Sequence, residues 1–205
     1  MHESQLTAAL EQINEIHGHM ARGQAYRGYR PLPVAFSGAL GLVAAYLQPY
    51  FVSPLAPETF ALYWMVAAAI CAVLAGSAVG LHFLQQPPWE RRQILFVWGQ
   101  FIPCLVAGGI AGAGIARSLP EAIPLLPGIW AIIFSMGIFA SRPFLPRITG
   151  WVALYYMVAG AWLLHEMPDP TRPAWALAVV FCIGQCAGAL MLYLKLERRC
   201  VYVED

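Results

Sequence analysis

The chain has 205 residues, of which 60% are hydrophobic and only 11% are charged, and its net charge is +1. Soluble domains carry roughly 25% charged residues, so this composition excludes a protein whose surface lies mainly in water. A net charge near zero also argues against the broad basic surface that nucleic-acid binding requires. The composition therefore predicts an all-α integral membrane protein whose main partner is the lipid bilayer.

Residues 1–31 precede the first apolar segment and are predicted to form a cytoplasmic leader with a basic juncture at its end. Within the leader, residues 3–22 carry apolar side chains at helical spacing, which predicts an amphipathic helix. Its apolar stripe could lie on the bundle, pair with a second copy of the chain, or bind a protein partner. The residues of this stripe are Leu6, Leu10, Ile13, Ile16 and Met20.

Six apolar segments follow, each close to the roughly 20 residues that a membrane-spanning helix needs. The breaks between them contain proline with polar or charged residues, a composition typical of turns. Residues 197–205 are predicted to form a short cytoplasmic tail. The six predicted spans cover residues 32–52, 60–84, 94–116, 122–140, 146–165 and 173–196.

The distribution of lysine and arginine predicts how the spans are oriented, because cytoplasmic loops are enriched in both residues. With the N-terminus in the cytoplasm, only Arg117 and Arg172 of the twelve basic residues fall outside. Both termini are therefore predicted to be cytoplasmic. Residues 125–160 are similar in general style to bacterial multi-span proteins, so the predicted location is a bacterial cytoplasmic (inner) membrane.

The tryptophans are predicted to form interfacial belts at the two membrane surfaces. Aligning Trp64 with Trp175 also aligns Cys71 with Cys182, a pattern that three tandem helical hairpins would produce. The alternative is that any six-span protein carries tryptophans near its interfaces. The predicted belt residues are Trp64, Trp130 and Trp175 on the outer side, and Trp89, Trp98 and Trp151 on the inner side.

Glycine pairs spaced four residues apart occur on the second, third and sixth predicted spans. Lipid gives helices little hydrophobic reason to associate, so small residues that permit close approach indicate packing surfaces. The sequence therefore predicts that these three spans meet at the centre of the bundle. The predicted packing residues are Gly76, Gly80, Gly108, Gly112, Gly184 and Gly188.

Cysteines on the same three spans lie at similar predicted depths. If the spans meet, the thiols of Cys71, Cys104, Cys182 and Cys186 would form a cluster suited to copper(I) or zinc. The favoured interpretation is packing, because free cysteine behaves as a small buried hydrophobe. A thiolate there would also lack a cationic neighbour. The prediction is therefore that the chain holds no metal and no cofactor.

No Asp, Glu, Lys or Arg lies well inside a predicted span, which argues against an ion-coupled pump. The sequence also lacks a nucleophile and base, or paired carboxylates, at one predicted depth, so an enzyme is not expected. The favoured function is an accessory, scaffold or sensor subunit that engages a partner through residues 3–22. The alternatives are a small carrier of a neutral or apolar solute, and a thiol metal or redox site at the membrane midplane.

Overall fold

The computed structural model describes residues 31–52, 58–85, 88–145, 147–166 and 173–200. All regular structure within these ranges is helical, which confirms the predicted all-α class. The α-helices are α2 (Pro31–Phe51), α3 (Glu58–Gln85), α4 (Pro88–Ser118), α5 (Leu126–Ser141), α6 (Thr149–His165) and α7 (Pro173–Cys200). Two short 3-10 helices, η1 (Pro120–Leu125) and η2 (Arg142–Phe144), precede and follow α5.

Five segments of these helices are long and apolar enough to cross a membrane. The helix α6 is shorter, with 17 residues. At 1.5 Å per residue it is about 26 Å long, slightly less than the roughly 30 Å of a bilayer's hydrocarbon core. The five segments are Leu32–Phe51, Glu58–Ala78, Ile94–Ser118, Pro120–Ser141 and Trp175–Leu194.

Two helix boundaries differ from the predicted spans for a local reason. The helix α4 begins at Pro88, six residues before the predicted start at residue 94. Proline suits the first turn of a helix, because its fixed φ is helical and its missing N–H would have no partner there. The same preference begins η1 at Pro120, so α5 itself starts only at Leu126.

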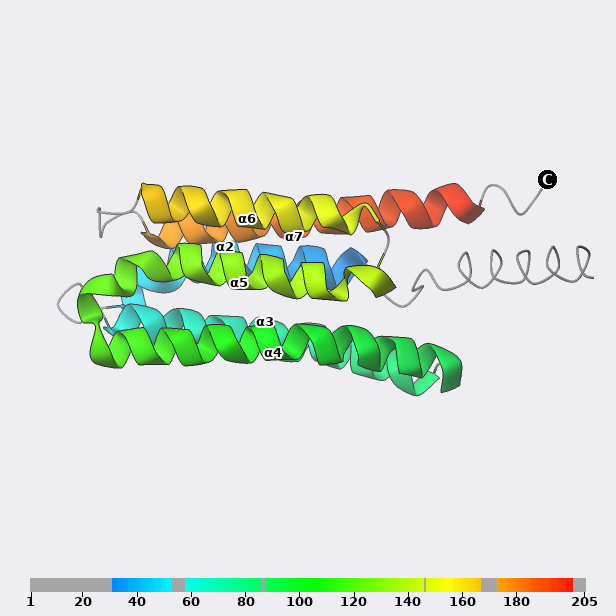
Figure 1. Cartoon of the computed structure of the whole chain (residues 1–205), viewed down its shortest axis with the longest axis horizontal. Coiled ribbons are helices and arrows are strands. Elements are labelled where there is room, and N and C mark those ends of the chain that lie inside the picture. Colours follow the sequence, from blue (N-terminus) through cyan, green and yellow to red (C-terminus); the bar gives the residue numbers. More distant parts are fainter. Residues whose placement is uncertain (1–30, 53–57, 86–87, 146, 167–172, 201–205) are drawn as a thin grey trace, which may run out of the picture.

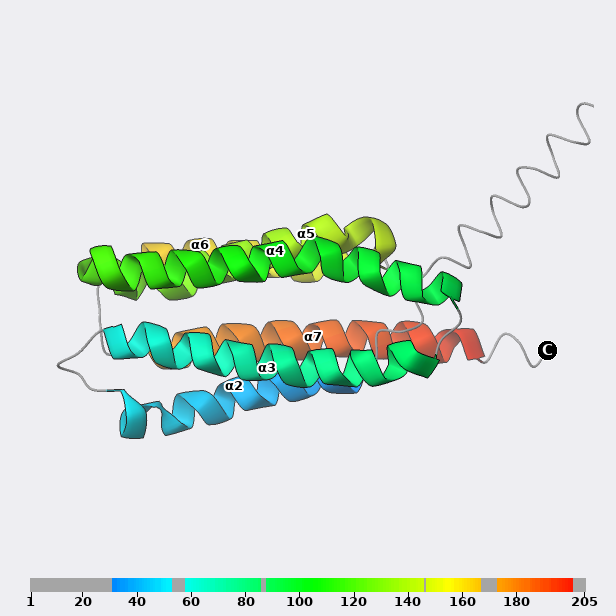
Figure 2. The same cartoon turned by 90° about the horizontal axis from the view of Figure 1, so that it is seen from below.

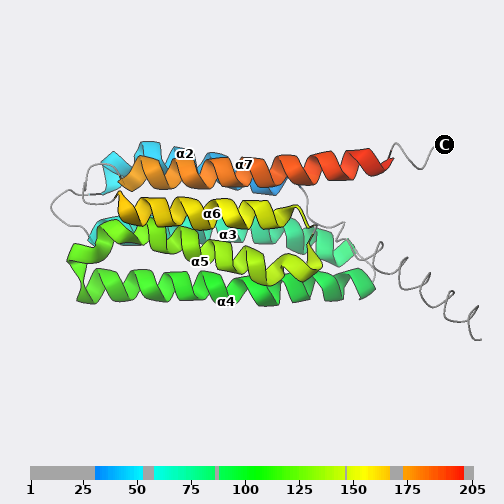
Figure 3. The same cartoon turned by 45° about the horizontal axis from the view of Figure 1, so that its top comes forward.

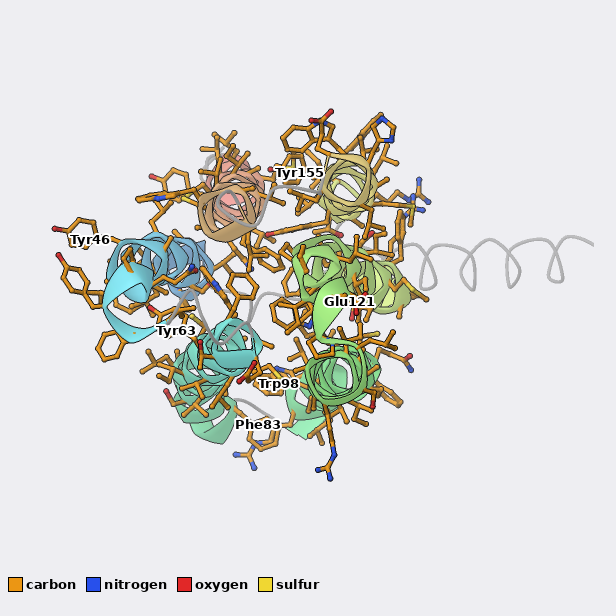
Figure 4. The ribbon with its side chains drawn as sticks, turned by 90° about the vertical axis from the view of Figure 1, so that its left-hand side faces the viewer. Tyr46, Tyr63, Phe83, Trp98, Glu121 and Tyr155 are labelled. Atoms are coloured by element: carbon orange, nitrogen blue, oxygen red, sulfur yellow. The ribbon has the colours of Figure 1, made fainter. Side chains whose placement is uncertain are left out.

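The six α-helices run antiparallel to one another in chain order (Figures 1 and 2). Each helix contacts the next, and α7 also packs along α2, so the helices close into a ring. Figure 3 shows the layers from the side, and Figure 4 shows the ring from one end. We call that end, where η1 lies, the η1 end, and the end where α2, α4 and α6 begin the N-terminal end.

The prediction that the second, third and sixth spans meet at the centre is wrong. These spans are α3, α4 and α7, and α7 lies between α6 and α2 in the ring. The closest packing is instead between α2 and α7 and between α5 and α6. Glycine spacing indicates where a helix can be approached closely, but it does not indicate which helix approaches.

The half of the ring nearest the η1 end is filled by apolar side chains. Two hydrogen bonds join α2 to α3 there: the Tyr63 hydroxyl donates to the Ala44 carbonyl at 2.6 Å, and Trp64 Nε1 donates to Gln48 Oε1 at 2.8 Å. These bonds satisfy polar groups that lipid could not. The buried residues of this core are Ala45, Phe60, Ala61, Trp64, Ile123, Leu126, Leu177 and Ala178.

The predicted tryptophan belt is wrong for the three tryptophans that point into the bundle. Trp64 is buried at 7% exposure, whereas Trp175 is 53% exposed. Trp130 donates a 3.0 Å hydrogen bond to the Gly108 carbonyl, and Trp98 packs against Gly76. Because Trp64 is buried and Trp175 is exposed, the first hairpin (α2 and α3) and the third hairpin (α6 and α7) are not equivalent at these positions.

Replacing Gln48 by leucine should destabilise the protein, because the indole N–H of buried Trp64 would lose its acceptor. We expect the free energy of unfolding to fall by roughly 0.5–2 kcal/mol, the range for hydrogen bonds between membrane helices. Thermal unfolding in detergent, followed by circular dichroism, measures the change. The control is Gln100→Leu, at an exposed position of α4, which should leave stability unchanged or raise it. Equal losses in the two variants would contradict the role assigned to Gln48.

Candidate functional site

A cavity of about 180 Å³ lies inside the ring, in the half nearest the N-terminal end. All six of these α-helices contribute to its wall, and none of the described residues that line it is acidic, basic or histidine. Its lining residues are Pro33, Val34, Ala72, Ala75, Val97, Trp98, Phe101, Ile102, Leu105, Phe134, Ile138, Ser141, Leu145, Thr149, Val152, Tyr156, Gly184, Gln185, Gly188 and Leu192.

An aromatic cluster separates this cavity from the core at the η1 end. Phe134 is its centre, with ring centroids 5.1 Å from Phe101, 4.9 Å from Tyr156 and 5.2 Å from Phe181. The rings meet edge to face, an arrangement that aromatic quadrupoles favour. The cluster joins α4, α5, α6 and α7, so it forms a rigid floor for the cavity.

Tyr156 is held in this floor by contacts with α7. Its side chain is fully buried, and its hydroxyl donates to the Phe181 carbonyl at 3.1 Å. A Cβ atom built on Gly184 would overlap the Tyr156 ring, so only glycine leaves room for it there. The neighbouring Tyr155 hydroxyl donates to the Val180 carbonyl at 3.1 Å, which fixes α6 to α7 a second time.

The predicted packing glycines mostly accommodate aromatic rings. A Cβ atom on Gly76 would lie 2.9 Å from Trp98, and one on Gly112 would lie 3.0 Å from Trp130. Gly108 also contacts Trp130, at 3.6 Å. Gly188 makes only ordinary contacts near 3.9 Å, and nothing lies within 4 Å of Gly80. Figure 4 shows Trp98 between α3 and α4, where it fills the space that Gly76 leaves.

A close backbone approach occurs at a glycine pair that sequence reasoning missed. A Cβ atom on Gly128 of α5 would lie 2.8 Å from the Gly160 carbonyl oxygen of α6, and the reverse distance is 2.9 Å. Gly38 of α2 similarly faces Gln185 and the Cys182 backbone of α7. Each of these glycines stands on its own helix without a glycine four residues away, so the small-xxx-small spacing could not reveal it.

Most polar groups in the cavity wall already have partners. The Ser141 hydroxyl donates to the Gly137 carbonyl at 2.9 Å, and the Tyr156 hydroxyl is used as described above. The half-buried Gln185 also lines the wall, and its side-chain amide has both hydrogen-bond donors and an acceptor. The cavity therefore suits a neutral and mainly apolar occupant.

The four thiols do not form the cluster that would bind a metal. Cys182 and Cys186 lie together on α7, with Sγ atoms 4.0 Å apart. Cys71 lies between α2 and α3, and Cys104 faces Gly137 of α5. In the part of the chain that the structure describes, no three His, Cys, Asp or Glu residues are placed to hold a metal ion. The cluster required α3, α4 and α7 to meet, and they do not.

The predicted partner-binding residues of the leader, Leu6, Leu10, Ile13, Ile16 and Met20, lie outside the described residues. Comparison with protein-family models, with curated proteins and with solved structures found no match. The cavity is therefore the feature from which a function can be argued.

Gly184 and Gly188 provide a matched pair of positions for testing whether the Tyr156 ring packs against Gly184. We expect Gly184→Ala to lower the free energy of unfolding by roughly 1–3 kcal/mol, the usual cost of overpacking, because the added methyl group displaces Tyr156. Gly188→Ala, one turn further along α7, should be neutral or stabilising, since alanine is the better helix former. Thermal unfolding in one detergent compares the two. A neutral Gly184→Ala would contradict the described position of Tyr156.

Proposed function

We propose that the chain spans a bacterial cytoplasmic membrane six times, with both termini in the cytoplasm. The charges of the described residues support this orientation. Arg91, Arg142 and Arg147 lie towards the N-terminal end, whereas the acidic residues Glu58, Glu121 and Glu166 lie towards the η1 end. The short α6 is counted as the sixth span because it completes the antiparallel ring.

We further propose that the protein is a small, non-enzymatic carrier of a neutral, largely apolar solute. The observation that carries this proposal is the cavity of about 180 Å³ with contributions from all six helices. Apolar cavities of roughly 150 Å³ stay dry and bind molecules the size of benzene. The amide of Gln185 would orient an occupant that carries one polar group.

The asymmetry of the ring also supports a carrier. The cavity reaches residues at the N-terminal end, namely Pro33, Leu145 and Thr149. Towards the η1 end, the Phe134 cluster and the core around Trp64 fill the interior. A carrier that works by alternating access opens its site to one side while the other side is closed. In this proposal the described arrangement is the state whose site faces the N-terminal end, which the proposed orientation places in the cytoplasm.

Trp98 in the cavity wall allows binding to be measured directly. Tribromoethanol is a small neutral molecule whose bromine atoms quench tryptophan on contact. We expect it to quench part of the protein's fluorescence with saturation, and Trp98→Phe should abolish this saturable part. Gly188→Leu should reduce it by filling the cavity, whereas Gly80→Leu, at a glycine with open surroundings, should not.

Ala72→Leu is a second variant that should fill the cavity, from α3. It keeps the test informative if Gly188→Leu does not fold. Thermal unfolding of each variant identifies those that keep their fold. Quenching that never saturates and is the same in Trp98→Phe would exclude binding in this cavity.

The accessory role predicted from the leader concerns residues outside the described part of the chain, and it remains the second proposal. It is tested by native mass spectrometry of protein released gently from its own membrane. A protein partner that is co-released, and that is lost when residues 3–22 are deleted, would support it. Release of the chain without any protein partner would contradict it, and a bound small apolar molecule would favour the carrier.

A further inference from the structure

A second hollow lies on the outside of the ring, between α2 and α3. This α2–α3 groove has a volume of about 590 Å³, and the described residues that line it all belong to these two helices. Phe36 and Leu40 of α2 form one wall, and Cys71, Leu74 and Ala78 of α3 form the other. Phe36 is 58% exposed and Leu74 is 43% exposed, so the groove opens away from the bundle, towards the lipid of a surrounding bilayer.

The groove and the cavity have two lining residues in common. Pro33 of α2 and Ala75 of α3 contribute to both. The two hollows are therefore neighbours, and the residues they share have short, apolar side chains. Ala72, one turn earlier on α3, lines the cavity, and Ala78, one turn later, lines the groove. Ala72, Ala75 and Ala78 thus place small side chains on α3 from the cavity wall to the groove wall.

The hydrogen bonds that join α2 to α3 among the described residues lie away from the groove. The hydrogen bonds of Tyr63 and Trp64 to α2 lie near the η1 end, as does the stacking of Phe51 on Tyr63, with centroids 6.1 Å apart. These contacts hold the two helices at one end. The groove lies nearer the other end, where the walls are small or flexible apolar side chains.

We propose that the α2–α3 groove is a lateral entry through which a hydrocarbon chain of a membrane lipid reaches the cavity. This inference rests on the proposed function and names the occupant and its path. Both hollows are apolar, and the lipid chains of the bilayer are the molecules that surround the groove. A chain that fills the cavity restores the dispersion contacts that a void forfeits. Its polar headgroup stays outside, so no buried charge is needed to bind it.

Quenching of Trp98 by lipid tests this entry. The full-length protein is placed in nanodiscs of phosphatidylcholine with brominated acyl chains, and the part of the quenching due to Trp98 is the difference from Trp98→Phe. We expect Trp98 to be quenched in the unmodified protein. Ala75→Phe should abolish this quenching by blocking the passage between the groove and the cavity. Ala69→Phe, on an exposed position of the same helix, should retain it.

A second blocking variant and a second quencher distinguish failure of lateral entry from failure of the carrier proposal. Ala39→Phe fills the groove from α2, away from Trp98, and should also abolish quenching by lipid. Tribromoethanol should still quench Trp98 in Ala75→Phe, because it can enter from the N-terminal end. If tribromoethanol quenches Trp98 but brominated lipid does not, or if both blocking variants leave lipid quenching intact, lateral entry is overturned and the carrier proposal stands. If neither quenches Trp98, both proposals fail.

Discussion

Close packing at glycines stabilises this ring of helices, because each glycine leaves room for a side chain or backbone of a neighbouring helix. Helices in lipid gain little from hydrophobic burial, so they associate through close van der Waals contact and hydrogen bonds. Gly128 and Gly160 bring the backbones of α5 and α6 together, and Gly184 accepts the Tyr156 ring, whose hydroxyl bonds to α7. Gly38 then brings α2 against α7 and closes the ring. Each contact relies on the absence of a Cβ atom.

The same contacts explain why one half of the ring is hollow. The Tyr156 ring packs against Gly184, and the Trp98 ring packs against Gly76. These large rings therefore line the cavity wall and do not fill the space at the centre of the ring of helices. At the η1 end, by contrast, Phe60 and Trp64 point inwards and are buried. The alanines Ala72 and Ala75 add little volume on the side of α3. The cavity is therefore the consequence of where the aromatic side chains find glycine.

The positions of the helices could be predicted from sequence, but their neighbours could not. Hydropathy located most ends of the described helices to within a few residues, because runs of about 20 apolar residues are typical of membrane-spanning helices. The start of α4 was missed because Pro88 begins the helix before the apolar run, and the start of α5 was missed because residues 120–125 form the 3-10 helix η1. The thiol cluster, the alternative to packing, is not formed by the described cysteines because similar depth does not imply adjacency. The cavity had no clear sequence signal, since most of its wall consists of ordinary apolar residues from six helices.

The absence of acidic, basic and histidine residues from the described part of the cavity wall limits what this protein could do as a carrier. In the described residues, the cavity offers dispersion contacts, the amide of Gln185 and hydroxyls already bonded to the backbone. One methylene group in such a pocket changes binding by roughly 1–3 kcal/mol, so selection between similar apolar solutes would be modest. Nothing in this wall could bind a coupling ion as carboxylates do in pumps. Movement would then follow the solute's own gradient, and a lateral groove open to lipid suits a solute that is already concentrated in the bilayer.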